Sequence, residues 1–226
     1  MPSPTLSPRV VLACCLPVVL AAFVNGCYLP LLAREGMFWF WLADLLQWLL
    51  LPFLMLRLLA QRGLTLAAAG FPWPLPQVQL PRDSLLLAGQ ALLVLASLAL
   101  VYFAVEPLAK ALFPEALVWF QFEDVELTGV SGRVLWLYSA LTAGVVESLF
   151  YIGLPWLACR RITWLSPLAF SLLSALVFSS VHWEQGLSGL LSAFAFGLAA
   201  CFWYFRLGHL WLVVLAHVAI DLYAFY

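Results

Sequence analysis

About seven apolar runs, each close to the length of a membrane-spanning helix, occupy most of this 226-residue chain. A helix needs ~20 apolar residues to cross the hydrocarbon core of a bilayer. Only 9% of the residues are charged, whereas soluble domains carry about 25%. The sequence therefore predicts an all-α fold, a polytopic transmembrane helical bundle that forms one membrane domain over residues 1–226 in the lipid bilayer. The predicted spans are 10–33, 37–60, 84–105, 134–158, 164–182, 187–205 and 210–226.

The distribution of basic residues predicts the orientation of the bundle. Cytoplasmic loops are enriched in Lys and Arg, and with seven spans one side receives seven of the ten basic residues. The N-terminus is on that side, so we expect it in the cytoplasm and the C-terminus outside; an eighth span would break this alternation. Only four apolar residues separate Arg9 from Cys14, fewer than the ~7–15 of a signal peptide. The run 10–33 is therefore expected to be an uncleaved first span.

Composition excludes nucleic-acid binding and favours a packing role for the cysteines. No stripe of basic residues is present, so we expect no nucleic acid partner. The five cysteines form no CxxC pair and lie in or beside apolar runs, where cysteine packs as a small hydrophobic residue.

Four ionisable residues inside the predicted spans are the candidates for function. A charge at membrane depth costs several kcal/mol, so each such residue needs a partner or a function. Glu147 is near the middle of the fourth span and His182 closes the fifth. His217 and Asp221 are four residues apart in the seventh span and therefore share one helix face.

These side chains have the functional groups of a hydrolase. A carboxylate and a neutral imidazole can hold a water molecule and remove its proton, and a second imidazole can stabilise the oxyanion formed from an amide. Glu147, His182 and His217 also have the donor types of a His₂Glu zinc site, and their spacing leaves both mechanisms open. The structural alternative is a set of interhelical hydrogen bonds, which is the role we expect for Asp44 and His209.

Three segments resemble the motifs of the CPBP family, which groups CAAX proteases with bacteriocin-processing enzymes. The first motif, usually Glu-Glu-x-x-x-Arg, resembles ESLFYIGL at 147–154. The second, Phe-x-x-x-His, matches FSSVH at 178–182, and the third, His-x-x-x-Asn/Asp, matches HVAID at 217–221. The order and spacing of the motifs agree over 134–226, which we interpret as the catalytic-motif core.

The resemblance implies a glutamic-type intramembrane endopeptidase of the bacterial inner membrane, with no cofactor and no metal ion. In the family, the first-motif Glu and the second-motif His activate water, and the resemblance gives these catalytic roles to Glu147 and His182. It gives the stabilisation of the oxyanion to His217 and Asp221. The expected partner is a membrane-anchored protein or peptide substrate.

Two positions of the first motif depart from the family pattern. The second Glu is Ser148 here, and the Arg is Ile152. Their joint loss removes an acid–base pair without changing the net charge. Such first motifs resemble those of a bacterial subgroup that processes proteins with C-terminal sorting anchors of the JDVT-CTERM type. The departure also leaves open a non-catalytic membrane scaffold or bacteriocin self-immunity protein. A small proton-coupled transporter is a third alternative, although the internal repeats typical of transporters are not visible.

The predicted topology places the candidate site toward the outer half of the membrane. The fifth and seventh spans both run outward, so His182 and Asp221 are expected near the outer interface. A site there would meet proteins that have already been exported, such as those with a C-terminal sorting anchor.

Overall fold

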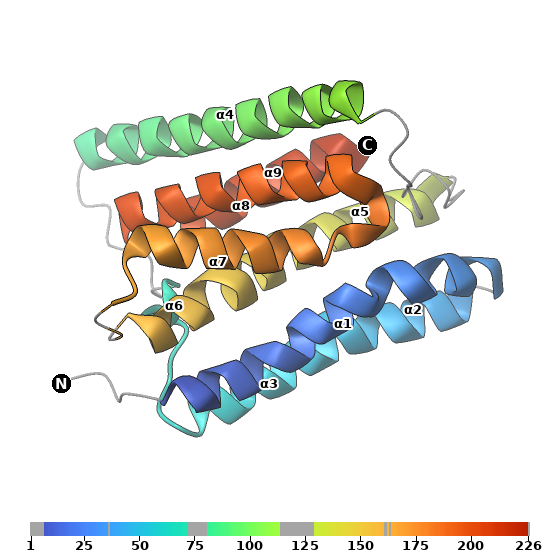
Figure 1. The fold of residues 1–226 in the computed structure, drawn as a ribbon, viewed down its shortest axis with the longest axis horizontal. Helices are drawn as coiled ribbons and strands as arrows, with labels where there is room; N and C mark the ends of the chain where they lie inside the picture. Colours follow the sequence, from blue (N-terminus) through green and yellow to red (C-terminus); the bar gives the residue numbers. More distant parts are fainter. Residues whose placement is uncertain are drawn as a thin grey trace.

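The computed structural model describes residues 7–35, 37–71, 81–113, 129–160, 162 and 164–225. Within these ranges the regular secondary structure is entirely helical. The long helices run beside one another as a bundle (Figure 1). The prediction of an all-α fold is confirmed.

Thirteen helical segments follow one another in the described ranges. They are α1 (Pro8–Glu35), α2 (Met37–Leu45), η1 (Leu46–Leu50), α3 (Leu51–Ala60), η2 (Ala67–Ala69), α4 (Pro81–Leu112), α5 (Gly129–Thr142), η4 (Ala143–Gly153), α6 (Leu154–Cys159), α7 (Pro167–Ser180), η5 (Trp183–Gln185), α8 (Gly186–Leu207) and α9 (Trp211–Phe225). The segments η1 and η4 are π-helical, whereas η2 and η5 are short 3₁₀ turns. Because α2, η1 and α3 are continuous, as are α5, η4 and α6, each of these trios forms a single span.

The helices reproduce the predicted spans. Five are long and apolar enough to cross a membrane, and α7 and α9 are shorter apolar helices. The helix α7 has 14 residues, which at ~1.5 Å per residue gives a length of about 21 Å. That is less than the ~30 Å of the hydrocarbon core. At least one end of α7 therefore lies within the hydrocarbon core. The connection at that end is part of the membrane domain.

Local sequence signals set the boundaries of the last helices. The hydroxyl of Ser166 accepts a hydrogen bond from the Ala169 amide at 3.1 Å, and Pro167 occupies the first helical turn of α7. The helix α8 ends at Gly208, whose φ of 75° is in the left-handed region and whose amide donates to the Tyr204 carbonyl at 2.8 Å. The first signal fixes the start of α7, and the second leaves only residues 208–210 between α8 and α9.

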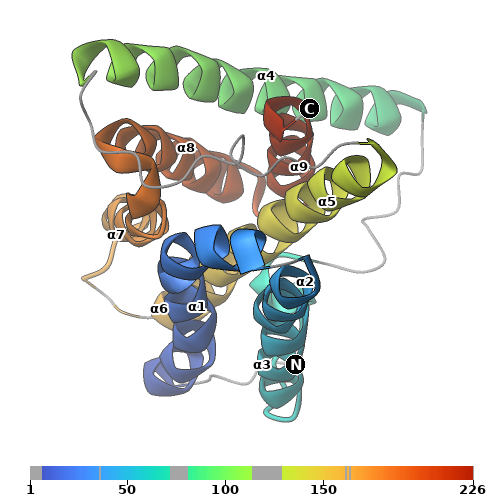
Figure 2. The ribbon, with the colours of Figure 1, turned by 90° about the vertical axis from the view of Figure 1, so that its right-hand side faces the viewer.

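The fourth span forms the centre of the bundle. Figure 1 shows α4 along one edge and α1 with α2 and α3 along the opposite edge, and Figure 2 shows α4 lying across α8 and α9. Between these layers, nine of the eleven residues of η4 are buried. A polar side chain on η4 is therefore held inside the protein and away from lipid.

The third span is longer than predicted. The sequence pattern ended it before Glu106 and Pro107, but α4 continues through Pro107 to Leu112. Proline removes one backbone hydrogen bond and commonly ends or bends a helix; here the turn around it also carries an ion pair between Glu106 and Lys110, 2.9 Å apart. Glu106 is therefore a helical residue. The sequence also predicts a short amphipathic element along the membrane interface in the connection 106–133, and most of it, 114–128, lies outside the described residues.

Candidate active site

The four predicted site residues come from three regions that meet in the centre of the bundle. Glu147 lies in η4 and is 8% exposed, and His217 lies in α9 and is 7% exposed. His182 stands between the end of α7 and the η5 turn. Asp221 is one turn beyond His217 on α9. The structure thus brings all four predicted residues into one neighbourhood.

The His217 side chain lies between two carboxyl groups. Its Nε2 atom is 3.7 Å from Oε2 of Glu147 and 3.5 Å from Oδ2 of Asp221. Both separations exceed an ordinary hydrogen bond, and catalytic contacts are often this long until substrate binds. A small closing movement would bring the three groups within hydrogen-bonding distance.

A backbone hydrogen bond orients His182. Its Nδ1 atom is 2.9 Å from the carbonyl oxygen of Phe178. Because a carbonyl oxygen can only accept, Nδ1 carries the proton in this hydrogen bond, and Nε2 of the neutral ring keeps its lone pair. That lone pair is what a residue needs to accept a proton from water.

Two adjoining cavities surround these side chains. Glu147 lines a small one of about 10 Å³, and His182 and Asp221 line a second one of about 80 Å³. Three residues line both cavities, Phe178, Phe196 and His217. By volume the first has room for about one water molecule and the second for several. The site therefore offers space for the water that a hydrolase requires.

Aromatic rings hold the two imidazoles in place. The ring centroid of Phe178 is 4.8 Å from that of His182 and 6.2 Å from that of His217. On the other side, the Phe196 ring is 4.7 Å from the His217 ring. The aromatic residue of the second motif thus packs against both histidines.

The backbone that carries Glu147 is wider than an α-helix. The segment η4 is π-helical over eleven residues, and such turns often occur at functional sites. The hydroxyl of Ser174 on α7 donates a 2.7 Å hydrogen bond to the Tyr151 carbonyl of η4. This buried bond joins the segment that carries Glu147 to the helix that leads to His182.

Gly144 allows η4 and α9 to approach closely. A Cβ atom at this position would overlap Cγ2 of Val218 and lie 2.9 Å from the Val218 backbone nitrogen. Because Val218 directly follows His217, this close approach sets the separation between Glu147 and His217.

We expect Gly144→Val to separate these two helices. Overpacking of this kind costs about 1–3 kcal/mol, so the melting temperature of the purified protein should fall. The peptide cleavage that the family resemblance implies should fall at least ~10-fold in liposomes, because a shift of about 1 Å can cost ~10²-fold. The matched control is Gly89→Val on α4, where a Cβ atom meets no atom within 4 Å. Equal behaviour of the two variants would contradict the role given to Gly144.

The two departures from the first motif lie in packed surroundings. Ser148 is 3% exposed and Ile152 is 5% exposed, and both line the smaller cavity. Among the described residues, no Lys or Arg lines either cavity. Where the family motif has a Glu and an Arg, this chain therefore has neutral side chains that are buried without leaving one charge unpaired.

Three polar residues at the site were not predicted from the sequence. Glu184 is 6% exposed, its Oε2 atom has no hydrogen-bond partner among the described residues, and it interacts electrostatically with Glu147. Tyr102 and Glu106 of α4 line the larger cavity. Glu184 could have been predicted as a site residue, because it lies only two residues after His182. Tyr102 and Glu106 could not have been predicted, because their distance from the three motifs in the sequence does not indicate contact with the site.

Asp44 and His209, for which we expected structural roles, lie apart from the cavities. Asp44 is 6% exposed, and its carboxyl group interacts with the Tyr138 side chain of α5. This contact joins the second and fourth spans. His209 lies in the connection between α8 and α9, and neither residue lines the two cavities of the site.

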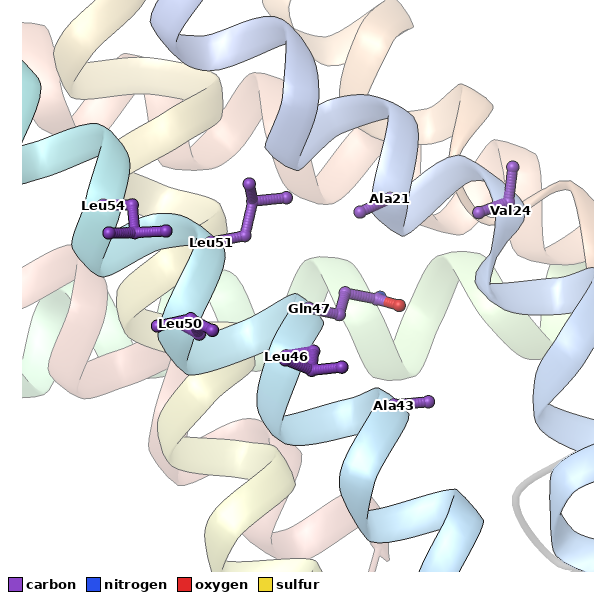
Figure 3. A pocket seen from close by; sticks show the side chains of 8 residues that line it. All are labelled: Ala21, Val24, Ala43, Leu46, Gln47, Leu50, Leu51 and Leu54. Carbon is purple, nitrogen blue, oxygen red and sulfur yellow. The ribbon is translucent and has the colours of Figure 1, made fainter.

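A larger hollow lies away from the site, between α1 and the second span (Figure 3). Its volume is about 510 Å³, and Gln47 is the one polar residue among its eight lining side chains. None of the four site residues lines it. Its apolar lining matches that of a groove facing lipid.

No preformed metal site is found in the described part of the chain. Within those ranges, no group of three or more His, Cys, Asp or Glu side chains has the arrangement needed to hold a metal ion. The zinc alternative raised by Glu147, His182 and His217 therefore has no preformed ligand set there.

Comparison with known proteins supports the family resemblance over the C-terminal part of the chain. Residues 129–223 match the family model described as type II CAAX prenyl endopeptidase Rce1-like. The matched segment contains all four site residues and confirms the family resemblance drawn from the three motifs. No curated protein and no solved structure matches the chain. The subgroup with JDVT-CTERM sorting signals stays a prediction. Over residues 129–223, this integral membrane protein is therefore similar to the Rce1-like type II CAAX prenyl endopeptidases.

Proposed function

We propose that this chain is a glutamic-type intramembrane endopeptidase that hydrolyses a peptide bond of a membrane-anchored or exported protein. The observation that carries the proposal is the convergence of Glu147, His217 and Asp221 beside water-sized cavities inside an apolar bundle. Ionisable residues inside membrane spans are rare and mark functional sites. The family match supports the protease class.

Glu147 is the proposed base and acid of the reaction. Its carboxylate accepts one proton from water while the water oxygen attacks the substrate carbonyl carbon, and the π electrons of that carbonyl move to its oxygen. The Nε2 lone pair of His182 accepts a hydrogen bond from the same water and orients it. When the tetrahedral intermediate collapses, Glu147 returns the proton to the amide nitrogen, which leaves as an amine. The carboxylate is then ready for another turnover.

His217 and Asp221 are proposed to stabilise the oxyanion. Since carboxylate oxygens accept hydrogen bonds, the Nε2 atom of His217 is the one expected to carry a proton between Glu147 and Asp221. This N–H group becomes a donor to the negative oxygen of the intermediate. Asp221, 3.5 Å away, holds the ring in that orientation.

The proposed substrates are exported proteins with a hydrophobic anchor, including those with C-terminal sorting anchors, at the bacterial inner membrane. Peptide bonds in a helical anchor are shielded by their own hydrogen bonds, so the substrate must unwind locally before it is cut. The larger cavity lies where the C-terminal parts of α4 and α9 meet the start of α8. In the predicted topology these ends face the outer half of the membrane.

The proposed orientation predicts which positions are accessible from outside. In a background without the five native cysteines, Lys110→Cys should react with a membrane-impermeant maleimide added to intact cells, whereas Arg206→Cys should react only after lysis. Both side chains are exposed, and each lies near the C-terminal end of its helix, in α4 and α8, which run in opposite directions through the bundle (Figure 1). The opposite labelling pattern would place the site on the cytoplasmic side and exclude exported substrates.

The function is tested by cleavage of candidate anchored proteins in reconstituted liposomes. Wild type is compared with Glu147→Ala and His182→Ala, each with and without a chelator. Cleavage by wild type that both variants lose and the chelator leaves unchanged supports the glutamate mechanism. Loss of cleavage with the chelator would make Glu147 and the histidines metal ligands. Equal behaviour of all three proteins across the substrates would favour a non-catalytic scaffold.

A further inference from the structure

The helix α4 contributes two polar side chains to the larger cavity. Tyr102 and Glu106 are one turn apart, so they project from the same face of the helix. They line the cavity together with His182, His217 and Asp221. Because α4 lies outside the segment 129–223 that matches the family model, neither the three motifs nor this match includes these two residues.

The Glu106 carboxylate is partly open and has an exchangeable partner. Its side chain is 29% exposed and forms a 2.9 Å ion pair with Lys110, whose side chain is 61% exposed. An exposed pair of this type contributes little to stability, because both side chains are easily solvated. Another cation that reaches the cavity can therefore replace Lys110 at small cost.

The charges around the cavity favour a positively charged guest. Glu106 and Asp221 line it, and Glu147 is 3.7 Å from the His217 ring on its border. No Lys or Arg is among the described residues that line it. The Tyr102 hydroxyl is in hydrogen-bonding contact with Glu106 and so holds one acidic group toward the cavity. A negatively charged guest would meet the carboxyl groups of Glu106 and Asp221, and only Glu106 has a cation, Lys110, beside it.

We propose that Glu106 is a specificity residue that binds a lysine or arginine side chain of the substrate close to the scissile bond, with Tyr102 orienting its carboxylate. This inference rests on the proposed function, since it places a substrate side chain in the cavity that contains His182 and His217. The substrate cation takes the position of the Lys110 ammonium group. Glu106 takes no part in proton transfer.

A binding experiment tests this proposal without requiring turnover. The probes are fluorescent Leu/Ala transmembrane peptides that carry a single Lys, Gln or Glu. In one series this residue is near the N-terminal end of the apolar stretch, and in the other it is near the C-terminal end. The protein is the full chain with Glu147→Gln in liposomes. In one of the two series, we expect the Kd of the Lys peptide to be at least ~10-fold lower than the Kd of the Gln peptide.

Substitutions at Glu106 then decide whether this preference comes from its carboxylate. Adding Glu106→Gln should make the Lys and Gln peptides bind equally, and Glu106→Lys should favour the Glu peptide. Lys110→Gln is the matched control and should retain the preference for Lys. The proposal would be overturned if the Lys and Gln peptides bound equally in both series. It would also be overturned if Glu106→Gln weakened the binding of all three peptides equally.

The same substitutions in the active protein separate this inference from the proposed function. With a cleaved substrate, Glu106→Gln should raise KM for the Lys form with little change in kcat, because it removes a binding contact. Cleavage that does not depend on the neighbouring charge would refute only the role of Glu106. Charge-dependent binding without any cleavage would refute only the peptidase.

Discussion

Replacing Glu147 with glutamine is expected to abolish peptide-bond cleavage while the bundle stays folded. Glutamine has nearly the same shape and can still hydrogen-bond to His217, but it cannot accept the proton of the attacking water. General acid–base catalysis contributes about 10²–10⁴-fold, and Glu147 is proposed to act in both the attack and the departure of the amine. We therefore expect kcat to fall at least ~10³-fold, measured as single-turnover cleavage in liposomes.

Asp44→Asn is the matched control for this change. Asp44 is also a buried acid inside a span, at 6% exposed compared with 8% for Glu147, but it lines neither cavity of the site. Both variants neutralise one buried carboxyl group, and only the change at Glu147 should stop cleavage. If Glu147→Gln retained more than about a tenth of wild-type kcat, its carboxylate would not be the base.

The second large effect is expected at His182. In His182→Asn, the side-chain amide can still donate to the Phe178 carbonyl, as Nδ1 does at 2.9 Å, but no atom replaces the Nε2 lone pair. The water would lose one of its two acceptors, so we expect kcat to fall about 10²–10⁴-fold. The KM for substrate should change little, since the proposed role is confined to the reacting water.

His209→Asn is the control for a histidine that stands outside the site. His209 lies between α8 and α9 and lines neither cavity, so its replacement should leave kcat within about twofold. If His182→Asn raised KM and left kcat unchanged, His182 would position the substrate and would have no direct part in water activation.

The apolar runs predicted the spans well because the length of an apolar run is set by the thickness of the bilayer. The candidate site was also visible, since a Glu, two His and an Asp inside lipid-compatible helices are conspicuous. The end of α4 was not predictable in the same way. Pro107 is a helix-breaking signal, and whether a helix continues past a proline depends on packing that only the folded chain supplies.

The remaining site features depend on contacts between distant parts of the chain. The π-helical backbone of η4 and the hydrogen bond from Ser174 to Tyr151 have no periodicity that a sequence pattern could detect. Tyr102 and Glu106 resemble ordinary residues near the end of a span. They became site residues only when the structure placed α4 across α8 and α9.

The small size of the two cavities determines how a substrate can enter. A space of about 80 Å³ next to one of about 10 Å³ holds a few water molecules, whereas pockets for ligands of drug size measure ~300–1,000 Å³. An unwound peptide segment therefore does not fit the resting arrangement, and helices must separate before it binds. The helix α4 borders the larger cavity from the edge of the bundle, so an outward displacement of α4 would open this cavity toward the membrane. Turnover of this protein would then be governed by the frequency of that opening, and bilayer thickness or fluidity would regulate its rate.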